Sequence, residues 1–172
     1  PPKLLTLYPY QSENRDCITR IKIDRCRRSL LYFTQKCLDH PKLEKFLVDV
    51  EYIVPAPSSL YSRINGKFDL AHWASLEIAA TYNISLKMAP KNSFWRFRKR
   101  SQIKNRRKNH THLTDFLGNK RPNRTEARQC DAGGQIILLD DVITTGFTFE
   151  QLILSTGIPQ EKIKLLALCD AR

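Results

Sequence analysis

The chain has 172 residues, of which 41% are hydrophobic and 27% are charged, and its formal net charge is +12. This length suits a single domain over residues 1–172, and the composition excludes a wholly disordered chain. No run of 18 apolar residues occurs, so a membrane-spanning helix is excluded and we expect no membrane insertion.

The first helices are expected soon after the N-terminus. Residues 16–38 mix apolar with basic side chains and contain neither Gly nor Pro, which predicts one long helix. Asp16 is its expected N-cap and His40-Pro41 its stop. A second helix is expected over residues 42–50.

A strand, a stiff loop and the clearest helix follow. Tyr52-Ile53-Val54 predicts a short buried strand, and Pro55-Ala56-Pro57 ends it because proline fixes φ and lacks the amide donor. Residues 69–82 carry apolar positions at helical spacing, and Asp69 is the expected cap. Residues 84–88 predict a short strand.

The last part of the chain alternates strand and helix. Ile136-Ile137-Leu138-Leu139 is typical of a central strand that is buried on both faces. We expect a helix from residues 149–155 and a closing strand over residues 162–169. Because strands alternate with helices along the chain, we predict an α/β fold with a mostly parallel sheet.

Residues 136–148, Ile-Ile-Leu-Leu-Asp-Asp-Val-Ile-Thr-Thr-Gly-Phe-Thr, indicate a ligand site. The buried strand delivers Asp140 and Asp141 to its carboxyl end, where open α/β sheets bind ligands. The hydroxyl residues around Gly146, followed by a helix start, are suited to hold a phosphate. The two carboxylates can accept hydrogen bonds from sugar hydroxyls and can help to hold Mg²⁺. A ribose 5-phosphate fits this combination.

This stretch resembles the phosphoribosyl-pyrophosphate (PRPP) signature of type I phosphoribosyltransferases, in which four apolar residues, two acidic, two apolar and Thr-Thr-Gly-small-Thr follow in order. The resemblance implies a Rossmann-like domain in which Asp140 and Asp141 are catalytic and hold the ribose hydroxyls and Mg²⁺. It also implies that the loop binds the 5-phosphate of PRPP through Ile143, Thr144, Thr145, Gly146, Phe147 and Thr148. Phe147 stands where the family usually has a small residue.

Further motifs are similar to those of the ComF (competence protein F, also called GntX-like) family. They are Tyr8-Pro9-Tyr10, Ile21-Lys22-Ile23, Ile53–Pro57 with Arg63 and Phe68, and Arg106–Asn109 with Phe116. The similarity implies a cytoplasmic protein of DNA uptake in natural transformation, with proteins of the competence machinery as partners. The family's Gly and Asn-Gln are replaced around Lys67–Leu70.

By the same resemblance, the loop after residue 54 holds pyrophosphate. Pro57 shapes it, Ser58 and Ser59 would donate hydrogen bonds to phosphate oxygens, and Arg63 would counter the phosphate charge. The alternative is a solvent-exposed loop with two serines.

The charge is concentrated in residues 91–128, a basic insertion or lid with thirteen basic and two acidic residues and a net charge of +11. Eight cations crowd together there, and we expect them to bind nucleic acid: Arg96, Arg98, Lys99, Arg100, Lys104, Arg106, Arg107 and Lys108. Three interpretations compete, namely a lid over the PRPP site, a track for single-stranded DNA, and a solvated face without a partner.

Two functions therefore remain open. In the first, a nitrogen nucleophile attacks the ribose C1 of Mg²⁺-bound PRPP and displaces pyrophosphate; no sequence element identifies the acceptor. In the second, the chain is a non-catalytic protein that binds single-stranded DNA, and PRPP is a regulatory ligand or its site a relic.

The cysteines indicate no disulfide framework. Their number, five, is odd and no Cys-x-x-Cys occurs, so buried thiols in a reducing cytoplasm are expected.

Overall fold

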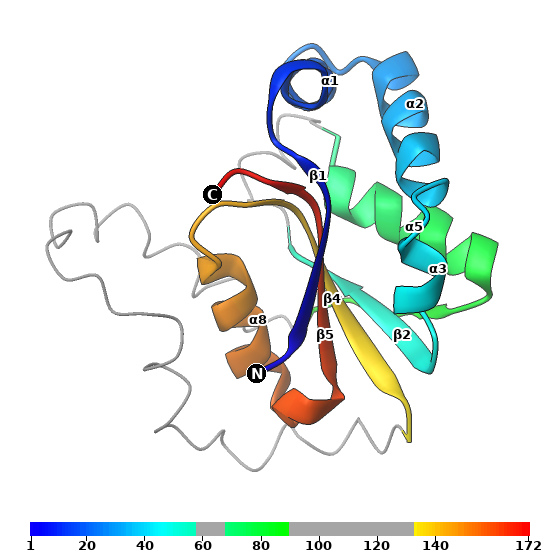
Figure 1. Ribbon diagram of the computed structural model, residues 1–172, viewed down its shortest axis with the longest axis vertical. Helices are drawn as coiled ribbons and strands as arrows, with labels where there is room; N and C mark the ends of the chain where they lie inside the picture. The colour runs from blue at the N-terminus through cyan, green and yellow to red at the C-terminus, as the bar shows by residue number, and fades with distance from the viewer. Residues whose placement is uncertain (58–67, 90–132) are drawn as a thin grey trace, which may run out of the picture.

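The computed structural model describes residues 1–57, 68–89 and 133–172. In these ranges five strands form one sheet in the order β1-β5-β4-β2-β3, and every neighbouring pair is parallel (Figure 1). The strands are β1 (Lys3–Pro9), β2 (Val50–Pro55), β3 (Ser85–Leu86), β4 (Gln135–Ile143) and β5 (Ile163–Asp170). The predicted α/β class with a parallel sheet is thus confirmed.

Helices cover both faces of this sheet. One face carries α1 (Ser12–Lys22), α2 (Arg27–Leu38), α3 (Leu43–Phe46) and α5 (Leu70–Tyr82), whereas α8 (Phe147–Thr156) lies on the other face (Figure 1). A 3₁₀ turn (Gln160–Lys162) leads into β5. No helix in the described ranges is long and apolar enough to cross a bilayer.

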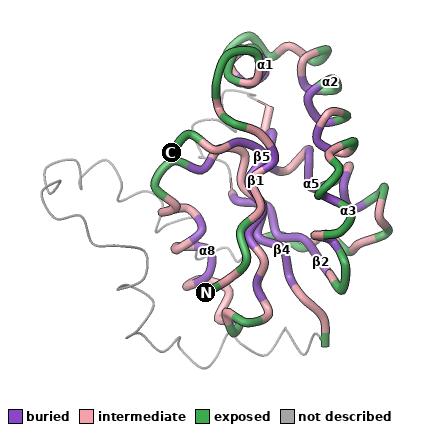
Figure 2. Tube along the Cα trace, viewed as in Figure 1, coloured by how far each residue is buried: buried purple, intermediate pink, exposed green. Residues whose placement is uncertain are grey.

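The central strand β4 divides the hydrophobic core into two layers. Ile137 and Leu139 pack with the α1, α2, α3 and α5 side, while Ile136 and Leu138 pack with the α8 side. Successive side chains of a strand point to opposite faces, so an uninterrupted apolar run fills both layers. Figure 2 shows this buried centre along β2, β4 and β5.

Local signals located several elements correctly. Helix α5 begins after Asp69, whose Oδ1 accepts a hydrogen bond from the backbone N–H of His72 at 3.1 Å. This contact satisfies one of the donors that a helix start leaves without a partner. The strands expected at residues 52–54, 136–139 and 162–169 are β2, β4 and β5.

The single helix expected over residues 16–38 is wrong. The segment forms α1 and α2, which are separated by Arg25 with a left-handed φ of 54°. Breaking the helix there lets both helices pack their apolar faces on the same core. Asp16 is also not the N-cap, because α1 begins at Ser12 with the extended Gln11 at that position.

Two other boundaries differ from the prediction. The helix expected over residues 42–50 is the single turn α3, because Asp49 has a left-handed φ of 62° and the chain reverses into β2 at Val50. Helix α8 begins at Phe147, two residues before the expected start. Strand β1 was not predicted at all, since only Leu7 of its seven residues is buried and edge strands carry a weak apolar pattern.

Candidate functional site

The acidic pair lies at the carboxyl end of the central strand. Asp140 and Asp141 are residues of β4 itself, and β4 continues to Ile143. Strands β2 and β5 flank β4, with Pro55 opposite Leu139 and Asp170 opposite Ile143. Because all strands are parallel, their carboxyl ends meet at this one edge, which is where open α/β sheets bind ligands.

The two carboxylates face opposite sides of the sheet. Asp140 has a hydrogen bond from the side chain of Thr148, in the first turn of α8. Asp141 pairs instead with Lys22, the last residue of α1, with 2.6 Å between Nζ and Oδ2. This follows from the alternation of side chains along a strand. The pair therefore reaches the helix layers on both sides of the sheet edge.

Asp140 is held in an environment that disfavours its charge. Burial, and then the neighbouring charge of Asp141, raise the pKa of the Asp140 carboxyl to about 7. The backbone N–H of Asp141, which donates to Asp140 Oδ1 at 2.9 Å, opposes this rise, as do Thr148 and Lys22. Strongly raised carboxyl pKa values are common at functional sites.

A short loop connects the acidic pair to α8. Gly146 is the N-cap residue of the helix and has a φ of 76°, a left-handed conformation that glycine adopts without steric cost. Thr144 and Thr145 are exposed, and Thr145 Oγ1 accepts a 3.4 Å contact from the backbone N–H of Phe147. A helix start of this kind leaves backbone donors and the positive end of the dipole facing the loop.

The remaining predicted residues of this loop, Ile143, Phe147 and Thr148, differ in their burial. The side chain of Ile143 is buried in the core on the α8 side, and its carbonyl accepts a hydrogen bond from Ala171, so the side chain faces away from the loop. Phe147 and Thr148 are half-buried in the first turn of α8. The described part of the site thus offers hydroxyls from Thr144, Thr145 and Thr148.

The neighbouring strand ends complete the edge. Pro57 follows β2 and is half-buried, and the backbone N–H of Ala56 donates to the carbonyl of Leu139 at 2.6 Å. This bond holds the start of the proposed pyrophosphate loop beside the residue that precedes the acidic pair. Ser58, Ser59 and Arg63 lie outside the described residues, as do all eight expected nucleic-acid-binding cations in residues 91–128.

A polar pocket of about 250 Å³ lies at the ends of β1 and β5. Arg172 forms an ion pair with Asp170 there, at 2.6 Å, and also donates to it through Nε at 2.9 Å. The Arg172 guanidinium holds the pKa of the Asp170 carboxyl below its usual value. The pocket is lined by Tyr10, Gln11, Arg15, Asp170, Ala171 and Arg172.

Helix α1 brings Lys22 to this edge. It starts directly after β1, and its last residue, Lys22, pairs with Asp141 of β4, which lies two positions from β1 in the sheet. Two strand spacings are about 10 Å, and an eleven-residue helix reaches about 16 Å, so this distance is within the length of α1. Lys22 belongs to the motif Ile21-Lys22-Ile23, but the sequence assigns it no task, since only the tertiary fold places it at the acidic pair.

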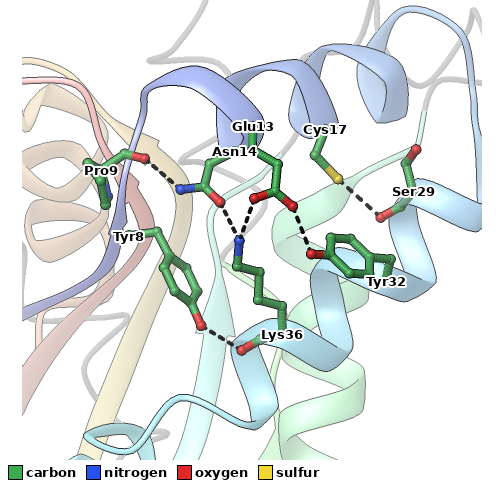
Figure 3. Close-up of polar contacts among 8 residues, drawn as sticks. All are labelled: Tyr8, Pro9, Glu13, Asn14, Cys17, Ser29, Tyr32 and Lys36. Carbon is green, nitrogen blue, oxygen red and sulfur yellow. Dashed lines mark hydrogen bonds and ion pairs between the residues drawn. The ribbon is translucent and has the colours of Figure 1, made fainter.

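Polar contacts fix the orientation of α1 (Figure 3). Asn14 Nδ2 donates to the carbonyl of Pro9 at the end of β1 at 3.1 Å, and its Oδ1 accepts from Lys36 Nζ of α2 at 2.9 Å. Lys36 also pairs with Glu13 at 3.6 Å, and the hydroxyl of Tyr32 donates to Glu13 at 2.8 Å. These contacts tie the first turn of α1 to both β1 and α2.

The donor set at the acidic pair suits Mg²⁺ only in part. No group of three or more His, Cys, Asp or Glu that could hold a metal occurs within residues 1–57, 68–89 and 133–172. Mg²⁺ is commonly bound by one or two carboxylates, with water and substrate phosphates completing its shell. Asp140 and Asp141 fit that pattern if a phosphorylated ligand supplies the remaining oxygens.

Comparison with known proteins does not identify a family. A scan against models of protein families gives no match to this sequence, and a search among curated proteins gives none.

Proposed function

We propose that this chain binds PRPP together with Mg²⁺ at the carboxyl end of β4, in a fold of the type I phosphoribosyltransferase kind. One arrangement supports the proposal: an acidic pair ends the central strand, and a hydroxyl loop with a left-handed glycine leads from it into α8. A ligand with a phosphate beside a vicinal diol matches this order of groups. The proposal includes a role in DNA uptake, as the motifs shared with the ComF family imply.

Each part of the site has a task in this proposal. Asp140 and Asp141 accept hydrogen bonds from the ribose hydroxyls, and the backbone donors at the start of α8 bind the 5-phosphate. The hydroxyls of Thr144, Thr145 and Thr148 add donors. The loop that begins at Pro57 receives the pyrophosphate, with Ser58, Ser59 and Arg63 as its donors.

Bound Mg²⁺ would supply positive charge to the pyrophosphate and make it a better leaving group. Asp140 and Asp141 would hold it, directly or through water. If the chain is an enzyme, a nitrogen nucleophile attacks the ribose C1 and the C1–oxygen bond to pyrophosphate breaks. The site contributes by positioning the sugar and stabilising the developing charges.

Calorimetric titration with PRPP, with and without Mg²⁺, tests the proposal. We expect binding in the micromolar to millimolar range that requires Asp140 and Asp141, so that the double variant Asp140→Asn, Asp141→Asn loses it. Asp170→Asn is the matched control, because it removes one carboxylate from the end of the adjacent strand and should leave binding intact. The absence of binding at millimolar PRPP would overturn the assignment.

A second candidate function is supported by the charge of residues 91–128, a net +11 within 38 residues. We propose that this segment binds single-stranded DNA, as a function beside PRPP binding or in place of catalysis. Fluorescence anisotropy should then show affinity that falls steeply with salt, by a slope of about −0.7 for each phosphate contact. Reversing the charges of Arg98, Lys99, Arg106 and Arg107 should abolish DNA binding and spare PRPP binding. A salt-independent signal would contradict this candidate.

A further inference from the structure

Lys22 neutralises one half of the acidic pair. Its Nζ lies 2.6 Å from Asp141 Oδ2, and the lysine and aspartate side chains are 40% and 20% exposed. The ammonium group thus contacts the carboxylate that Mg²⁺ would need, on the side of the sheet where α1 lies. Its charge also acts on Asp140.

The position of Lys22 is set by the fold. Cys17, Ile18 and Ile21 bury the inner face of α1, and the contacts of Asn14 and Lys36 hold its first turn. The backbone N–H of Ile23 closes the last turn with a 2.8 Å bond to the carbonyl of Thr19. Lys22 therefore sits at the end of a fixed helix, and only its flexible side chain has to move for its charge to leave Asp141.

A divalent cation and an ammonium group cannot share one carboxylate without mutual repulsion. A divalent cation and an ammonium group about 4 Å apart repel by roughly 2 kcal/mol in bulk water, and by more at the lower effective dielectric of a protein surface. Phosphate groups change this balance, because they attract both cations and give the ammonium group a second partner.

We propose that Lys22 is the resident counter-ion of the acidic pair, so that a divalent cation enters this site only together with the phosphorylated ligand. In the free protein Lys22 holds Asp141. When PRPP binds, its phosphate oxygens accept the ammonium group of Lys22 and Asp141 becomes available to the metal. This inference rests on the proposed function, since it concerns the order of binding at the same site.

The test measures metal and PRPP separately. Mn²⁺ replaces Mg²⁺ as the probe, and the free ion is followed by electron paramagnetic resonance without any phosphate present. Relative to the unmodified chain, Lys22→Met should bind Mn²⁺ roughly tenfold more tightly, whereas Lys22→Arg should not. Arg20→Met is the matched control, because it removes the same charge from an exposed position of α1 two residues away.

PRPP binding should change in the opposite direction. Lys22→Met should bind PRPP about tenfold more weakly, although it binds the metal alone more tightly. A structural role for Lys22 would lower both affinities, so opposite changes distinguish the counter-ion role from damage to the fold. In the Asp141→Asn background Lys22→Met should leave Mn²⁺ affinity unchanged.

Three results would overturn the inference: unchanged Mn²⁺ affinity in Lys22→Met, an equal increase in Arg20→Met, or an increase that persists without the Asp141 carboxylate. If Lys22→Met does not fold, Lys22→Gln replaces it under the same criteria. If the unmodified chain fails to bind PRPP, the proposed function fails. The Mn²⁺ comparison still decides whether Lys22 keeps cations from the acidic pair.

Discussion

Asp140 should lower the stability of the folded chain above neutral pH. Its carboxyl pKa is raised from 3.8 to about 7, chiefly by burial and then by the charge of Asp141. A difference of roughly three pKa units corresponds to about 4 kcal/mol of free energy. An ionised Asp140 therefore destabilises the folded state by up to about this amount.

The sign of the pH dependence follows from the raised pKa. The folded state binds the Asp140 proton more tightly than the unfolded state, so stability falls as pH rises from about 4 to about 7 and then stays lower. Asp140→Asn removes the charge and keeps an oxygen that accepts from the Asp141 N–H. The variant should thus gain stability at pH 8, by up to about 4 kcal/mol, and gain almost none at pH 4.

Urea denaturation at pH 4, 6 and 8, followed by circular dichroism, measures this gain for the unmodified and variant chains. Asp170→Asn is the control with the opposite sign, because Arg172 lowers the pKa of Asp170. That variant should lose stability at pH 8. The reasoning is refuted if Asp140→Asn is no more stable than the unmodified chain at pH 8, or if its advantage does not grow between pH 4 and 8.

Three further predictions concern the elements that frame the site. Asp69→Ala should lower the free energy of unfolding by about 1 kcal/mol in the same urea assay, because it removes the cap of α5. Asp69→Asn keeps the acceptor oxygen and should therefore retain most of the stability that the cap contributes. Gly146→Ala should lower the free energy of unfolding by about 1 kcal/mol, since a φ of 76° disfavours a side chain, and it should also weaken PRPP binding in calorimetry. An unchanged free energy of unfolding would contradict the strain expected at this turn. Lys36→Met should speed hydrogen exchange of the α1 amides more than of α5, because it removes the contacts to Glu13 and Asn14; equal exchange in both helices would contradict an anchoring role.

The sequence predicted those features that short stretches of chain determine. The apolar run before Asp140 identified a central strand, and Asp69 before an apolar helix identified a cap. The break between α1 and α2 was missed, because Arg25 adopts a left-handed conformation without the glycine that usually marks one. A one-residue backbone choice of this kind depends on tertiary packing, which local propensity does not describe.

Lys22 shows the same limit at the site. The sequence indicates Asp141 as a site residue, but its partner comes from a helix near the other end of the chain. That contact depends on the sheet order, which places β4 two positions from β1, and on α1, which leads from β1 to Asp141. Sheet order is a property of the whole fold, so no spacing rule within the signature could have identified Lys22.

The acidic pair consequently consists of two unlike groups, although both are aspartates and neighbours in the chain. Asp140 is enclosed on the α8 side, with a hydroxyl donor and a raised pKa, and it has no ion-pair partner among the contacts described for it. Asp141 is half-buried on the α1 side and already holds a cation. A neutral donor such as a ribose hydroxyl can approach Asp140 without displacing an ion, whereas a metal ion at Asp141 must first displace Lys22. If the proposed function holds, a ribose hydroxyl therefore reaches Asp140 more readily and the exchange of Lys22 for a metal ion takes place at Asp141, and the proposed order of binding follows from that difference.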